Sequence, residues 1–87
     1  MIRHSDLTNR EVRKMIRHKN ITHAGNVKLK IVGTLRCTSG SRMKKVNRVF
    51  FSSLHEARSH RFRPCGHCMR DAYQLWKNEF IQQRQHR

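Results

Sequence analysis

Acidic residues are scarce in this sequence. Five Asp and Glu stand against 20 Lys and Arg, which gives a formal net charge of +15 on 87 residues. An excess of this size repels itself in a compact state and favours polyanionic partners. Long apolar runs are also missing, because no stretch approaches the roughly 20 residues needed to cross a bilayer, and residues 1–10 are too polar for a signal peptide. We therefore expect a cytoplasmic monomer that binds nucleic acid and no membrane.

Cysteine and proline are few as well. The odd number of three cysteines argues against a disulfide framework, and without an export signal these thiols should remain reduced. Only 36% of the residues are hydrophobic, so this short chain buries little apolar surface, and a bound metal would add stability. We expect one domain, residues 1–87, with its core at about 5–80 and a frayed tail at 82–87.

Helix signals lie at three places. Thr8 and Glu11 have the spacing of a capping box, with Ser5 as an alternative start, and a short helix begins at Ser53-x-x-Glu56 and ends near His60. A third, amphipathic helix is predicted after the only proline. The apolar stripe of the first helix consists of Leu7, Val12, Met15 and Ile16, and that of the last of Met69, Ala72, Tyr73, Trp76 and Phe80.

Two strand signals lie between these helices. From Val27 to Leu35, after an exit loop at 20–26, apolar and basic residues alternate and predict a half-buried strand with Val27, Leu29, Ile31 and Leu35 on its apolar face. A loop at 38–45 leads to a second short strand, Arg48–Ser52. The predicted fold is α/β in the α+β sense: a small three-layered domain with a short sheet, an N-terminal helix, a short middle helix and a C-terminal helix.

The aromatic residues are expected in the core rather than on a base-stacking surface. Adjacent Phe50 and Phe51 point to opposite faces of their strand, so one of them is a candidate for exposure near a nucleic acid. The full set is Phe50, Phe51, Phe62, Tyr73, Trp76 and Phe80.

The run Arg-Pro-Cys-Gly-His-Cys at 63–68 carries the clearest chemical signal. Two cysteines separated by two residues can direct both sulfurs at one soft metal ion, and a thiolate from elsewhere in the fold closes such a site. Cys37, at the end of the first predicted strand, is the remaining thiol. We therefore expect one zinc ion on Cys37, Cys65 and Cys68, the alternative being three reduced thiols that pack as small apolar groups.

Residues 26–76 resemble the Ada-type metal-binding domain, the zinc module of the bacterial Ada DNA alkylation-response protein. The likeness consists of a strand that ends in cysteine (30–37), an Asn-x-x-Phe-Phe-like strand (47–51) and a Phe-Arg-Pro-Cys-x-x-Cys segment (62–68). The resemblance implies a short sheet around a zinc held by four cysteines. It also implies that Cys37 is a catalytic nucleophile, which takes a methyl group irreversibly from a methylated phosphate of the DNA backbone.

One position departs from the family pattern. The family has a second cysteine four residues after the acceptor, where this chain has Ser41. A hydroxyl is a poorer zinc ligand than a thiolate at neutral pH, so the fourth position goes to a histidine, to water or to nothing. Without the fourth thiolate the sulfur of Cys37 is less electron-rich and should attack a methyl carbon more slowly. The candidate histidines are His23, His55, His60 and, least favoured because it adjoins Cys68, His67.

Basic residues around the predicted site are the candidates for contacts to DNA phosphates. Five flank the loop after Cys37, and two lie along the preceding strand. They are Arg36, Arg42, Lys44, Lys45 and Arg48, with Lys28 and Lys30. Such contacts supply salt-dependent affinity without sequence information.

Three functions are consistent with these features. The first is a zinc-dependent DNA-binding module that transfers a methyl group from a backbone phosphotriester to Cys37. The second is a non-enzymatic module that binds DNA or structured RNA, with zinc only as a support for the fold. The third is a metal-free basic protein of the ribosomal type, which stoichiometric zinc would refute.

Overall fold

The computed structural model describes residues 1–36 and 43–85, with side chains up to residue 79. Its elements form one mixed sheet in the order β1-β4-β2-β3-β5, in which only β3 and β5 pair in parallel. In chain order they are β1 (Ile2–Arg3), the 3₁₀ turn η1 (His4–Asp6), α1 (Asn9–Arg17), β2 (His23–Asn26), β3 (Ile31–Thr34), the 3₁₀ turn η2 (Lys45–Asn47), β4 (Arg48–Phe51), α3 (Leu54–Ser59), β5 (Arg63–Pro64) and α4 (Arg70–Gln85).

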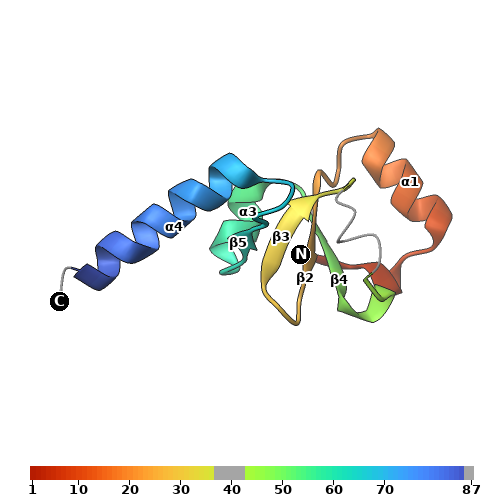
Figure 1. Cartoon of the computed structure of the whole chain (residues 1–87). Helices are drawn as coiled ribbons and strands as arrows, with labels where there is room; N and C mark the ends of the chain where they lie inside the picture. Colours follow the sequence, from red (N-terminus) through yellow and green to blue (C-terminus); the bar gives the residue numbers. More distant parts are fainter. Residues whose placement is uncertain (37–42, 86–87) are drawn as a thin grey trace.

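The layers follow from the side chains of the sheet. Phe50 and Phe51 are each 1% exposed and point to opposite faces, as neighbours on a strand must. The Phe51 face, which α3 covers, has a core of Val32, Val49, Phe51, Ala57 and Phe62, and the Phe50 face, which α1 covers, has a core of Ile21, Ala24 and Phe50. The α+β class and the three layers are confirmed (Figure 1). The expectation that Phe50 or Phe51 could be exposed is wrong, because both rings are buried. In the described part of the chain, none of the helices is both apolar enough and long enough to span a bilayer.

Helix α1 begins where the sequence predicts. The Thr8 hydroxyl accepts from the amide of Glu11 (3.1 Å), and the Glu11 carboxylate accepts from the amide of Thr8 (3.0 Å), which completes a capping box. Three of the four predicted stripe residues pack on the Phe50 core, but Ile16 is 40% exposed.

The strand predicted at Val27–Leu35 is confirmed at Ile31–Thr34 and wrong at Val27–Lys30, and the exit loop predicted at 20–26 is wrong from His23 on. The chain forms a hairpin instead, with β2 inside the expected loop and a turn inside the expected strand. The Asn26 carboxamide oxygen accepts from the amides of Lys28 (2.9 Å) and Leu29 (3.1 Å). Asn side chains can thus bind backbone amides that would otherwise pair with a neighbouring strand, and they favour a turn. Leu29 is therefore 63% exposed, while Val32 is fully buried at 0%.

Gly25 lies inside strand β2 although the sequence suggests a loop residue. A Cβ atom at this position would lie 3.0 Å from ring carbons of both Phe51 and Phe62. Those two rings meet edge to face, with centroids 4.9 Å apart. The glycine is needed because two aromatic rings occupy the space above its backbone.

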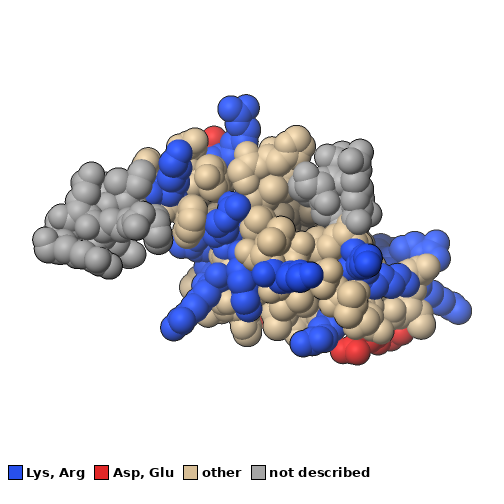
Figure 2. Space-filling view, turned by 60° about the horizontal axis from the view of Figure 1, so that its bottom comes forward, with Lys and Arg blue, Asp and Glu red and all other residues tan. Residues whose placement is uncertain are grey.

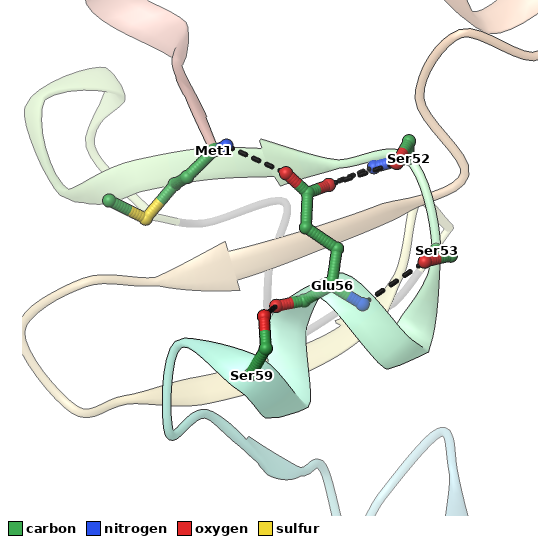
Figure 3. Close-up of polar contacts among 5 residues, drawn as sticks. All are labelled: Met1, Ser52, Ser53, Glu56 and Ser59. Atoms are coloured by element: carbon green, nitrogen blue, oxygen red, sulfur yellow. Dashed lines mark hydrogen bonds and ion pairs between the residues drawn. The ribbon is translucent and has the colours of Figure 1, made fainter.

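Helix α3 confirms the second predicted start in part. The Ser53 hydroxyl accepts from the amide of Glu56 (3.0 Å), but the Glu56 carboxylate does not accept from the amide of Ser53, so the capping box is incomplete. It accepts from the amide (2.7 Å) and hydroxyl (3.0 Å) of Ser52 and from the Met1 ammonium (2.8 Å), as Figure 3 shows. The ammonium and the Ser52 amide hold the pKa of Glu56 down to about 2. Glu56 thereby joins α3 to the end of β1.

Helix α4 confirms the third helix and extends beyond it. It continues to Gln85, through most of the segment predicted as a tail, and it points away from the sheet (Figure 1). Tyr73 and Trp76 are half-buried rather than core residues, and the side chain of Phe80 lies outside the described residues. The aromatic stripe of this helix therefore packs on the edge of the domain.

Candidate metal centre

The cysteine pair lies at the end of β3 because β5 runs parallel to that strand. The amide of Cys65 donates to the carbonyl of Val32 (2.7 Å), which continues the β3–β5 pairing past Pro64. Parallel strands leave a sheet at the same end, so the two segments emerge side by side. The amide of Thr34 lies 3.4 Å from the Sγ of Cys68 and donates to it. Thr34 precedes Cys37 by three residues in the sequence, so the segment that leads to Cys37 begins beside the pair.

The two sulfurs have the surroundings of metal-binding thiolates. Both cysteines are half-buried, and neither is in a disulfide. The amide of His67 donates to the Sγ of Cys65 (3.4 Å), as that of Thr34 does to Cys68. Backbone N–H donors stabilise the negative charge on a ligating sulfur and fix its orientation. This donor set fits zinc, which favours thiolate ligands.

The described residues add no further ligand to the pair. Over 1–36 and 43–85, no group of three or more His, Cys, Asp or Glu is close enough to hold a metal. His23 instead has its Nδ1 2.8 Å from the Thr22 hydroxyl, and burial lowers its pKa. His60 lies against the Phe51 ring, with centroids 6.0 Å apart. Cys37 and Ser41 lie outside the described residues, so the role of Cys37 as a ligand and nucleophile stays a prediction.

The predicted phosphate contacts do not form one patch. The turn that carries Lys28 and Lys30 is joined to η2, because the amide of Val27 donates to the carbonyl of Asn47 (2.8 Å). Lys44, Lys45 and the backbone of Arg48 therefore lie at that end of the sheet, whereas Arg36 follows β3 at the end that carries the cysteines. The guanidinium of Arg48 extends toward Leu35, the neighbour of Arg36. Lys and Arg side chains are spread widely over the face in Figure 2 rather than gathered in one place. Arg42 lies outside the described residues.

Arg48 is half-buried and serves the fold directly. Its guanidinium lies 5.4 Å from the Phe50 ring centroid and its Nη2 donates to the carbonyl of Leu35 (3.5 Å). Lys30 packs its Nζ 5.0 Å from the Phe62 ring centroid while the residue remains exposed. Of the described candidates, all but Arg48 are exposed.

Arg63 is the basic residue that sequence reasoning left out. It precedes the cysteine pair on β5, and its guanidinium lies over the rings of Tyr73 (5.4 Å) and Trp76 (5.7 Å). These rings stack with centroids 5.8 Å apart, so the three side chains join β5 to α4. The position of Arg63 next to the cysteine pair was a signal in the sequence. It was missed because Tyr73 and Trp76 were expected in the core, where they could not contact an arginine.

Residues 14–71 match the family described as the metal binding domain of Ada. The chain belongs to this family. Comparisons with curated proteins and with solved structures give no significant match. The matched range includes β2 to β5 and all three cysteines. The protein is therefore a zinc-binding module of the Ada type, which confirms the predicted cofactor.

Proposed function

We propose that this zinc-binding module binds the backbone of duplex DNA and that Cys37 accepts a methyl group from a methylated backbone phosphate. The observation that carries the proposal is the contact between the Thr34 amide and the Cys68 sulfur at 3.4 Å. It brings the strand that precedes Cys37 to the cysteine pair. A thiolate held near this pair would have the metal beside it as the source of its activation.

The charge distribution supports binding to the backbone. A formal charge of +15 and exposed lysines at the hairpin end favour association with a polyanion. Contacts to phosphates release counterions, so affinity should fall steeply as salt rises. A methylated phosphate is itself uncharged, so the cations would bind its ionised neighbours and position the methyl group.

The transfer needs no other reactant. A bond forms between the Cys37 sulfur and the methyl carbon as the bond from that carbon to the phosphate oxygen breaks. The electron pair of the broken bond stays on oxygen, which leaves an ordinary phosphodiester anion and a thioether. Bound zinc would supply a thiolate at neutral pH. Because the thioether is stable, each chain would act once.

Ser41 favours a second candidate function. With serine where the family has a ligating cysteine, the metal has one thiolate fewer to donate electron density. A module of this kind would keep zinc as a structural ion and bind nucleic acid without transferring a group. The contact between the Thr34 amide and the Cys68 sulfur serves both functions, because each needs the strand beside the cysteine pair.

Mass spectrometry separates the two candidates. The zinc-loaded protein is incubated with a duplex that carries one methylphosphotriester and, as a control, with the unmodified duplex. Transfer predicts a gain of one methyl group on Cys37 that Cys37→Ser abolishes, and a faster gain in Ser41→Cys. An unmodified protein that retains salt-dependent affinity establishes the non-enzymatic module. Absence of affinity for either duplex at low salt refutes both.

A further inference from the structure

Side chains from three elements meet around the Phe50 ring. His4, on η1, packs with its ring centroid 5.0 Å from that of Phe50. Arg48, on β4, lies over the same ring at 5.4 Å. The antiparallel register that pairs Arg3 with Val49 brings His4 alongside Arg48. Two cationic or titratable groups therefore cover one buried ring on the Phe50 face.

Lys45, on η2, supplies a second cation to this cluster. Its Nζ donates to the Asn9 carboxamide oxygen (3.2 Å) at the start of α1, which is a neutral amide and not a carboxylate. Positive charge from Arg48 and from Lys45 acts on the ring of His4. On its own element, η1, the nearest carboxylate in sequence is that of Asp6, which is exposed to solvent.

The imidazole of His4 is in an unusual position for a surface histidine. Its Nδ1 is buried and has no hydrogen-bond partner. A buried N–H without an acceptor is more costly than a buried lone pair, so the proton of the neutral ring belongs on Nε2. Burial, then Arg48, then Lys45 lower the pKa of His4. These effects favour the neutral ring in the absence of an anion.

We propose that His4, Lys45 and Arg48 form a subsite for a backbone phosphate of DNA, and that His4 takes up a proton when the phosphate binds. The proposal rests on the proposed DNA binding and adds a phosphate position on the Phe50 face. Protonation of His4 creates an N–H on the buried Nδ1, so the phosphate must accept a hydrogen bond from this atom. Its charge between the two cations also offsets their repulsion of the imidazolium. By linkage, affinity rises as pH falls through the pKa of His4 in the complex.

The first test uses inorganic sulfate, whose charge does not change over this range. The ring resonances of His4 are followed by NMR from about pH 5.5 to 8, a range in which histidine titrates, with and without sulfate. Exposed His18, at the C-terminal end of α1, is the internal control. Sulfate should raise the pKa of His4, and the rise should be smaller in Lys45→Gln. The ring resonances of His18 should respond little to sulfate. A His4 pKa that sulfate does not move overturns the subsite.

The second test measures affinity for a short duplex over the same pH range. All seven histidines add charge at low pH, so His4→Gln is compared with His18→Gln as well as with the natural chain. Acidification should strengthen binding about three- to tenfold less in His4→Gln, as expected for a pKa rise of about half a unit to one unit. Equal pH dependence in the two variants refutes proton uptake by His4. Absence of DNA binding at every pH overturns the proposed function, while the sulfate titration still decides whether the anion subsite exists.

Discussion

The two faces of the sheet are built differently. On the Phe51 face every core side chain is at most 1% exposed, and Gly25 lets two aromatic rings approach the backbone. On the Phe50 face three buried residues are covered by half-buried side chains, and His4 and Arg48 lie against the aromatic ring. The Phe51 face leads through Phe62 into β5 and the cysteine pair, and Lys30 and His60 lie against the outer sides of its rings. On the Phe50 face the groups against the ring, His4 and Arg48, belong to a cluster that also includes Lys45. Substitutions on the Phe51 face should therefore affect zinc binding, and substitutions on the Phe50 face should affect anion binding.

Metal removal should have the largest effect. Zinc binding by small modules is coupled to folding, with apparent binding free energies of about 10–16 kcal/mol for zinc-finger peptides, so chelation should abolish cooperative unfolding or lower the midpoint strongly. Amide exchange locates the loss: the Cys65 amide, which donates to Val32, should lose protection before the Val12 amide in α1. Simultaneous loss at both amides would mean that the two faces do not respond separately.

Truncation of the two central rings compares the faces directly. Phe51→Ala and Phe50→Ala each remove a fully buried ring and should each lower the free energy of unfolding by about 3–5 kcal/mol. Zinc affinity should fall markedly only in Phe51→Ala, because Phe51 packs on Phe62 next to β5. Denaturant unfolding and a competitive zinc chelator measure the two quantities. Equal losses of zinc affinity would contradict this division.

Gly25→Ala tests how tightly the Phe51 face is closed. The added methyl group would lie 3.0 Å from two ring carbons, and such overpacking costs about 1–3 kcal/mol. Gly66→Ala is the matched control, because a Cβ there meets only the Tyr73 ring, at 3.4 Å. Thermal unfolding of the zinc-loaded proteins should separate them clearly. Similar midpoints would mean that the rings move aside at little cost.

Glu56 joins α3 to the residue before β1 and makes this link sensitive to acid. Its folded pKa of about 2 lies below the ordinary value of 4.5, so the stabilisation is complete above about 4.5 and is lost as pH falls toward 2. Glu56→Gln should cost roughly 1–2 kcal/mol at neutral pH, after allowance for solvent screening, and progressively less below pH 4.5. Urea unfolding at several pH values measures it. Glu79→Gln is the control, because Glu79 is exposed and its oxygen is 3.8 Å from Arg58. A constant cost at all pH values would exclude this carboxylate as the source.

Features that depend on neighbouring residues were predictable from the sequence. The capping box at Thr8 and Glu11 and the start of α3 at Ser53 were found because a cap needs only residues three apart. The β2–β3 hairpin was missed because the apolar and basic residues of its turn happen to alternate. Asn26 indicates the turn, because its side chain accepts from the turn amides. A single Asn is a weaker signal than the alternation of apolar and basic residues that follows it.

The amino-acid order by itself determined the spacing of the Cys65–Cys68 pair, the helix caps and the opposite orientation of Phe50 and Phe51, because each depends on spacing along a few bonds. Only the tertiary structure decided that β5 runs parallel to β3 and carries Cys68 to Thr34, that the basic residues divide between the two ends of the sheet, and that His4 joins Arg48 over one ring. These arrangements join residues that are distant in the chain. Their choice depends on which apolar surfaces can be buried together, and local propensities do not encode that.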